Sequence, residues 1–227
     1  MKADLALCSI AFGKYHAVLL AALFLAACTT MLRAERFAPT LKKFISADGA
    51  VEFRYSEELV HCERQGANEG YSWLPVENCA AYFPLCDSSI SQNQTSIACF
   101  AYPRNRFTDT RAFEGATFSV EIIDAATRQN DCLSMSAEEG FIGQRGTRTI
   151  HGVSFTTAEL SDAGMSQRIH GHVYRTFHGG KCYQLGINVV TADSQTFDPP
   201  VRDLSKSDWR EIYGPLEQAR DSFRFLK

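Results

Sequence analysis

The sequence predicts an α+β fold in which a mostly antiparallel β-sheet is sandwiched with helices and stapled by disulfides. Short segments rich in β-branched and aromatic residues, separated by turn residues, recur between residues 44 and 190, as is typical of antiparallel sheets. One segment with helical spacing of apolar residues follows them, at 206–220. Six cysteines lie beyond the N-terminal leader, and an even number in an exported chain favours a disulfide framework.

The leader itself has the features of an export signal. Lys2 and Lys14 precede an apolar run at 17–27, AVLLAALFLAA, which contains no charge. A membrane-spanning helix needs about 20 apolar residues, whereas the hydrophobic region of a signal peptide needs only about 7 to 15. The run therefore predicts a signal peptide rather than a membrane span.

Residues Leu25-Ala26-Ala27-Cys28 end this run and resemble the lipobox of bacterial lipoproteins. The resemblance implies that Cys28 becomes the first mature residue and carries acyl chains on its sulfur, which attach the chain to a lipid bilayer. The alternative is an ordinary secretory signal cut near Ala27, leaving Cys28 as a plain thiol. Thr29 is not Asp, the residue that retains lipoproteins at the inner membrane in enterobacteria-like sorting, so the outer membrane is favoured.

The chain divides into three expected parts. Residues 1–27 are the signal peptide, 28–40 a tether, and 41–227 one α+β domain, since this length suits a single substantial core. The formal net charge is −3 at pH 7, and Lys and Arg form no long basic stripe. Nucleic acid is therefore excluded as an expected partner.

The six remaining cysteines are predicted to form disulfides: Cys62, Cys79, Cys86, Cys99, Cys132 and Cys182. No CxxC pair occurs among them, so their spacing does not match paired zinc ligands. Six cysteines allow 15 connectivities, and the sequence does not choose among them. We expect an N-terminal group of four and a C-terminal pair, Cys132 with Cys182.

The first part of the expected domain begins with a hairpin. The segment FISADGAVEFRY (44–55) surrounds Asp48-Gly49, a strong hairpin signal. Ser56 is then suited to cap a short helix that ends near Cys62. Residues 63–94 are rich in Asn, Ser, Gly and Pro and are expected to be stapled by cysteines. Three residues of that segment either pack within it or line a binding surface: Tyr71, Trp73 and Asn78.

More strands and one helix are predicted to follow. Single strands are expected at 95–102, 116–123 and 148–157. The longest hairpin pairs 166–178 with 181–190 around Gly179-Gly180, and 222–227 alternates like an edge strand.

The helix expected at 206–220 has one apolar face. Ser207 is suited to be its N-cap, and Gly214-Pro215 is expected to kink or split it. The apolar face comprises Trp209, Ile212, Tyr213, Leu216 and Ala219.

His170 and His172 are the candidate metal ligands, because residues two apart on a strand share one face. A two-residue loop at Gly179-Gly180 would put both imidazoles beside Leu185 and Ile187. A three-residue loop, 179–181, would instead gather the aliphatic residues and leave the histidines outside. We expect the second register, since the first would bury two imidazoles where aliphatic residues could lie. A metal site would also need a third ligand, so a solvated histidine face is expected.

Four segments together are similar to the PsbP-like superfamily: GAVEFRYSEEL (49–59), HGVSF (151–155), GHVYRTFHGGKCYQLGINVV (171–190) and DSFRFLK (221–227). The resemblance covers roughly residues 41–227 and implies an antiparallel sheet sandwiched with helices. Members of this superfamily bind photosystem components or a small GTPase, and the resemblance implies no catalytic residues here.

The function classes follow from these observations. The sequence contains no GxSxG, HExxH or SxxK motif, so no catalytic residue and no cofactor is assigned. The leading hypothesis is a non-catalytic, membrane-anchored envelope lipoprotein that binds another envelope protein or a small ligand. The alternatives are an envelope enzyme whose polar groups assemble only in the fold, and a weak metal binder through the face of His170 and His172.

Overall fold

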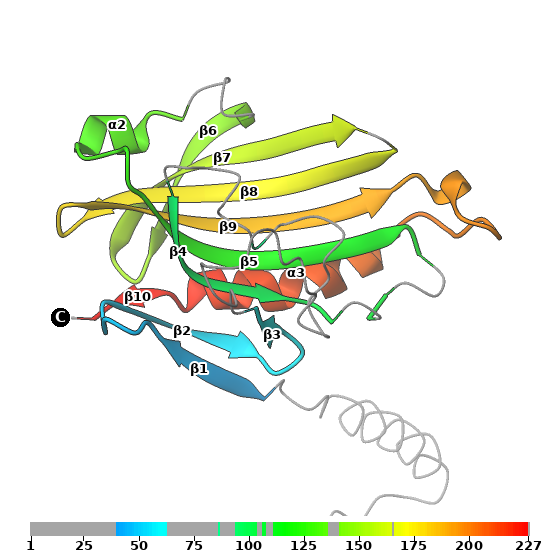
Figure 1. Ribbon diagram of the computed structural model, residues 1–227, viewed down its shortest axis with the longest axis horizontal. Helices are drawn as coiled ribbons and strands as arrows, with labels where there is room; N and C mark the ends of the chain where they lie inside the picture. Colours follow the sequence, from blue (N-terminus) through cyan, green and yellow to red (C-terminus); the bar gives the residue numbers. More distant parts are fainter. Residues whose placement is uncertain are drawn as a thin grey trace, which may run out of the picture. The chain divides into compact units, whose positions relative to one another are not determined.

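Two antiparallel sheets contain all of the strands in the described residues (Figure 1). The computed structural model describes residues 40–62, 86, 94–103, 106–107, 111–135, 141–164 and 166–226. Met1–Thr40 and Leu41–Lys227 are separate units, and the second contains every strand and helix named below. Among the described residues, no helix is both long enough and apolar enough to cross a bilayer.

The smaller sheet has the strand order β1-β2-β10. Its strands are β1 (Leu41–Ile45), β2 (Val51–Ser56) and β10 (Arg224–Phe225). The predicted hairpin at its start is confirmed, with Gly49 at φ +67° in the turn. The backbone amides of Ala50 and Val51 donate to the Ser46 hydroxyl across this turn, at 3.0 and 3.1 Å. The predicted C-terminal edge strand is also confirmed, since Arg224 pairs with Glu52 of β2.

The larger sheet has the order β3-β4-β5-β9-β8-β7-β6. The strands are β3 (Val60–His61), β4 (Gln94–Ala101), β5 (Phe113–Ile123), β6 (Phe141–Ile150), β7 (Val153–Gly164), β8 (Gln167–His178) and β9 (Lys181–Ala192). Three helical pieces complete the described fold: α2 (Gln129–Leu133), η3 (Ser194–Thr196) and α3 (Lys206–Asp221). The predicted class, α+β with mostly antiparallel sheets and a covering helix, is confirmed.

Two predicted elements are wrong. The short helix expected after Ser56 does not form, because the Ser56 hydroxyl accepts from the amide of Glu58 in a turn that leads into β3. The strand expected at 148–157 is instead a hairpin bend, with His151 and Gly152 at φ +45° and +80°. β6 ends before this bend and β7 starts after it.

The register of the β8–β9 hairpin also differs from the one expected. His178 pairs with Lys181, so Gly179 and Gly180 alone form the loop. Both glycines have positive φ, +56° and +79°, as a two-residue turn of type I′ requires. That turn matches the right-handed twist of the strands. The hairpin therefore has the register of a two-residue loop, although the pattern of apolar residues favoured a three-residue loop.

α3 covers one face of the larger sheet, behind it in Figure 1. Its N-cap is Ser205 rather than the expected Ser207, with a complete capping box to Asp208. The predicted apolar face is confirmed, since Ile212, Leu216 and Ala219 are fully buried in the main core. Further core residues come from both sheets and include Phe53, Phe100, Phe118, Leu185 and Ile187.

Pro215 lies inside α3 without splitting it. A proline has no amide hydrogen, so the carbonyl of Glu211, four residues earlier, loses its usual helical donor. The hydroxyl of Tyr102 replaces that donor, lying 3.2 Å from the Glu211 carbonyl oxygen and 3.0 Å from that of Ile212. Tyr102 is itself completely buried, and α3 continues through Pro215 instead of splitting there.

Candidate functional site

A groove opens at the end of the larger sheet where β8 begins, β9 ends and α3 starts. Its volume is about 810 Å³, within the usual size range of small-molecule sites. Both polar and apolar side chains line it, including Gln167, Arg168, His170, Ser194, Asp203 and Trp209. We call this feature the sheet-end groove.

One wall of the sheet-end groove is the turn that leaves β9. The amide of Asp193 donates to the carbonyl of Ser166 across the groove's edge, at 2.8 Å. The carboxylate of Asp193 then accepts from the amide of Gln195, at 3.0 Å, and caps η3. Ser194, which is buried, is thereby held in the wall with its neighbour Gln195 exposed beside it.

Four rings form a half-buried layer that links β8 to α3. His170 meets Trp209 edge to face, with ring centroids 5.1 Å apart, and His172 meets Tyr213 in the same way at 5.6 Å. Trp209 and Tyr213 stack on each other at 5.8 Å. The expected solvated histidine face is therefore wrong, because α3 covers it. The two-residue turn aims both imidazoles at the helix.

The electrostatic state of His170 follows from its position. Burial, and secondly the charge of Arg168, lower the pKa of His170 below its usual value, which favours the neutral imidazole. Its ring contact is Trp209, and it makes no hydrogen bond to a carboxylate in the described part of the chain. Likewise, no three His, Cys, Asp or Glu residues within the described ranges are grouped to hold a metal ion.

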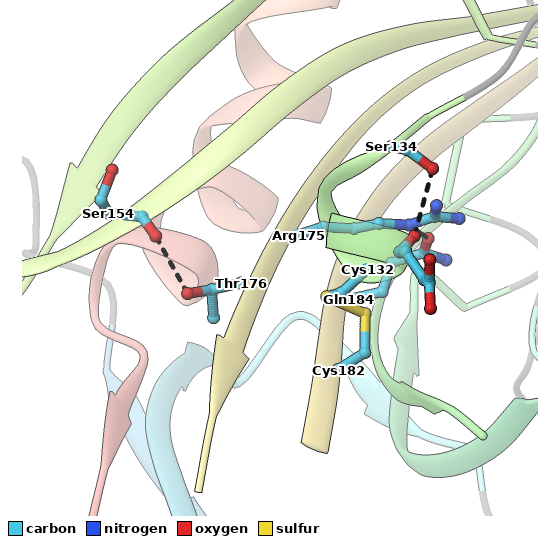
Figure 2. Close-up of a disulfide and its surroundings, with 8 residues drawn as sticks. Cys132, Ser134, Ser154, Arg175, Thr176, Cys182 and Gln184 are labelled. Atoms are coloured by element: carbon cyan, nitrogen blue, oxygen red, sulfur yellow. Dashed lines mark hydrogen bonds between the residues drawn. A yellow bond between two sulfur atoms is a disulfide. The ribbon is translucent and has the colours of Figure 1, made fainter. Parts of the chain in front are cut away.

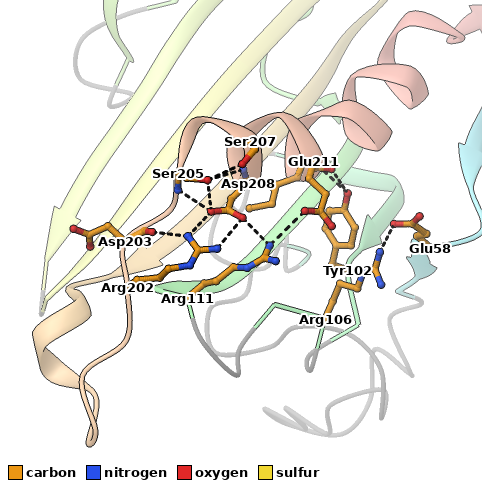
Figure 3. Close-up of polar contacts among 11 residues, drawn as sticks. Glu58, Tyr102, Arg106, Arg111, Arg202, Asp203, Ser205, Ser207, Asp208 and Glu211 are labelled. Atoms are coloured by element: carbon orange, nitrogen blue, oxygen red, sulfur yellow. Dashed lines mark hydrogen bonds and ion pairs between the residues drawn. The ribbon is translucent and has the colours of Figure 1, made fainter. Parts of the chain in front are cut away.

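A polar network anchors the start of α3 beside the sheet-end groove (Figure 3). Arg202 donates to both carboxylate oxygens of Asp208, at 2.6 and 3.1 Å, while Arg111 pairs with the same carboxylate at 3.0 Å. The Ser205 amide also donates to it, at 2.8 Å. Arg202, then Ser205, hold the pKa of Asp208 far below its usual range. The network fixes residues 202–205, of which Asp203 and Leu204 line the groove.

The opposite face of the larger sheet carries a second polar row, next to a disulfide (Figure 2). Glu121, Gln184 and Arg175 face one another across β5, β9 and β8. Arg175 donates to Gln184 at 2.8 Å, and Gln184 donates to Glu121 at 3.0 Å. Burial raises the pKa of Glu121, against the lowering effect of the bond from Gln184. These groups satisfy one another, so the row is fitted to hold the sheet together.

The cysteines are oxidised in the described residues. Cys132 bonds to Cys182, the expected C-terminal pair, and joins α2 to β9. Cys86 bonds to Cys99, within the expected group of four. Cys62 is disulfide-bonded as well. Cys79 lies outside the described residues.

Several other predicted positions cannot be compared with the structure. The lipidation residue Cys28 and the residues Tyr71, Trp73 and Asn78 lie outside the described ranges.

Two residues of the groove and its neighbouring network, Arg168 and Asp208, were not predicted from the sequence. The pattern Ser205-x-x-Asp208 before an apolar run is a capping signal that would have found Asp208, whereas no local pattern marks Arg168.

No family model matches the sequence, and no curated protein sequence matches it. Solved structures with a similar fold include cyanobacterial PsbP from Synechocystis sp. PCC 6803, at 13% identity and a TM-score of 0.41, covering 85% of this chain and 96% of that one. LpqN of Mycobacterium tuberculosis, described as involved in cell envelope biogenesis, has 9% identity and a TM-score of 0.43 over 84% and 92%. A Bacteroides thetaiotaomicron protein has 11% identity and a TM-score of 0.43 over 82% of this chain; this chain spans 48% of that protein.

Proposed function

We propose that this chain is a membrane-anchored lipoprotein of the bacterial cell envelope and that its domain is a non-catalytic binding module. The sheet-end groove carries the proposal, because it is a cavity of ligand size lined by an aromatic surface, a cation and amide groups. The lipobox Leu25-Ala26-Ala27-Cys28 supports attachment through acylated Cys28. Thr29 supports an outer-membrane position.

The lining of the sheet-end groove suits binding better than catalysis. A general acid–base pair needs two titratable groups within hydrogen-bonding reach of each other or of one reacting atom. Here His170 is engaged by Trp209, and the carboxylate of Asp193 is used to cap η3. Arg168 remains beside the cavity as a group that can bind a polar ligand. The side-chain amides of Gln167 and Gln195 also line the cavity, where they donate to Glu114 and Ser194.

The proposed ligand is a small polar molecule or the end of a partner protein's chain that has one apolar side. Trp209 offers the apolar contact, since an aromatic ring buries area at little entropic cost. Arg168 offers donors to an acceptor group on the ligand. Asp203, on the neighbouring wall, offers an acceptor to a ligand hydroxyl or amine.

Photo-crosslinking in the native envelope tests this site. A photoreactive residue in place of exposed Gln195, on the groove wall, is expected to capture a discrete partner or ligand. The matched control places the same residue at exposed Gln129 in α2. The captured product should be absent at position 129 and should weaken in the Arg168→Ala background. The same products at both positions, or none at 195, would contradict a binding role for the groove.

A further inference from the structure

The outer face of the smaller sheet is exposed and combines aliphatic with basic side chains. Leu41 and Ile45 of β1 are 37% and 48% exposed, and they are the exposed large hydrophobic residues of the described chain. Lys43 lies between them, and the strand period of two puts all three on one face. In the antiparallel register, Arg54 of β2 is opposite Lys43. We call this feature the β1 face.

The charge of the β1 face is opposite to that of the whole chain. Three cations lie on it, Lys43, Arg54 and Arg224, against the single carboxylate of Glu52. Lys43 pairs with Glu52 at 3.1 Å and Arg224 pairs with it from the other side, and Lys43 and then Arg224 hold the pKa of Glu52 below its usual value. The face is therefore net positive, although the chain carries a formal charge of −3.

The form of β1 disfavours a partner strand as the occupant of this face. β1 is a short edge strand of five residues that carries Lys42 and Lys43 next to each other. Short length and lysines on an edge strand are features that prevent pairing with another strand. Exposed aliphatic residues among cations instead match surfaces that enter the headgroup region of an anionic bilayer.

We propose that the β1 face lies against an anionic phospholipid bilayer, with Leu41 and Ile45 entering the headgroup region and Arg54 contacting lipid phosphates. The inference rests on the proposed function, under which residues 28–40 connect β1 to acylated Cys28. Thirteen extended residues reach at most about 45 Å, so the anchor keeps this face near the bilayer. Tethering of this kind raises the effective concentration of a weak second contact.

Vesicle flotation tests the β1 face separately from the lipid anchor. The probe is the mature chain, residues 28–227, with Cys28→Ser, so that no acyl chain contributes; residues 41–227 form a unit of their own. It is mixed with vesicles of phosphatidylcholine alone or with phosphatidylglycerol added. We expect binding to the anionic vesicles, falling as salt concentration rises, and much weaker binding to the neutral ones.

The matched variants are Arg54→Gln and Arg54→Gln/Ile45→Ser, which leave the ion pairs of Glu52 intact. Loss of one surface cation is expected to weaken binding about fivefold, and loss of the aliphatic contact as well at least about tenfold. Arg128→Gln, which removes an exposed cation from the N-cap of α2, should bind like the wild type. Equal binding of wild type and double variant, or no wild-type binding to anionic vesicles, would overturn the inference. Because the probe is unacylated, neither result depends on whether Cys28 is lipidated in cells.

Discussion

The hydroxyl of Tyr102 is predicted to be coupled energetically to Pro215. In the wild type this hydroxyl is the donor that replaces the missing proline amide at the Glu211 carbonyl. Burial raises the pKa of Tyr102 well above its usual value, so the hydroxyl keeps its proton throughout the range in which proteins are normally studied. The informative perturbation is Tyr102→Phe, made both in the wild type and in Pro215→Ala.

The expected magnitudes follow from the contacts. Tyr102→Phe keeps the buried ring and its packing against Phe107 and Phe113, and leaves the partly buried carbonyl of Glu211 without a donor. Such a loss costs about 1 to 3 kcal/mol. In Pro215→Ala the backbone amide of residue 215 can donate to Glu211 as in an ordinary helix. The same Tyr102→Phe change should then cost about 1 kcal/mol less.

The measurement is a double-mutant cycle of unfolding free energies from urea titrations, with the disulfides kept oxidised. All four proteins should have similar slopes with denaturant, since the surface exposed on unfolding is nearly unchanged. The coupling would be refuted if the unfolding free-energy changes of the two single variants summed to that of the double variant within about 0.5 kcal/mol. That result would show that the Tyr102 hydroxyl does not compensate for the proline.

Three further predictions concern stability, each measured by urea unfolding. Replacing Cys132 and Cys182 with Ser opens a loop of 50 residues and should cost about 3 to 4 kcal/mol; unchanged stability would contradict a role for this bridge. Gly180→Ala should cost about 1 to 2 kcal/mol of stability because the φ of Gly180 is +79°, whereas Gly214→Ala in α3 should stabilise the fold by about 0.5 to 1 kcal/mol. Neither new Cβ would have an atom within 4 Å, so steric clashes contribute to neither effect. Two effects of the same sign would refute this explanation from backbone conformation. Asp208→Asn should cost about 2 kcal/mol at pH 7. Because the pKa of Asp208 is lowered in the fold, the wild-type advantage should be complete above the unfolded pKa of about 4 and shrink as pH falls below it; an advantage that grows on acidification would contradict this sign.

The sequence was most informative where one local signal agreed with the packing. Asp48-Gly49 and Gly179-Gly180 locate two hairpins, because glycine tolerates the positive φ of tight turns. The spacing of Ile212, Leu216 and Ala219 locates α3 and its buried face. The pairing of Cys132 with Cys182 was expected from grouping alone, and the structure has it.

The remaining features depend on contacts between distant segments. The β8–β9 register was mispredicted because an apolar face was preferred to turn geometry, although α3 supplies Trp209 and Tyr213 as partners for the two imidazoles. Pro215 was expected to kink or split the helix because proline has no amide hydrogen. The donor that compensates for it, the hydroxyl of Tyr102, is far away in sequence, so no local pattern predicts it. The sheet-end groove joins β8, β9, η3 and α3, and no local pattern predicts such a junction.

Mass spectrometry of the protein taken from its own membrane tests the proposed membrane anchor most directly. The account predicts an N-terminal peptide that begins at Cys28 and carries acyl chains, on an intact protein whose mass is lower than that of the reduced form by the six hydrogens of three disulfides. A chain recovered without acyl mass, with Cys28 as a free thiol, would contradict the claim that this binding module is a lipid-anchored protein of the envelope.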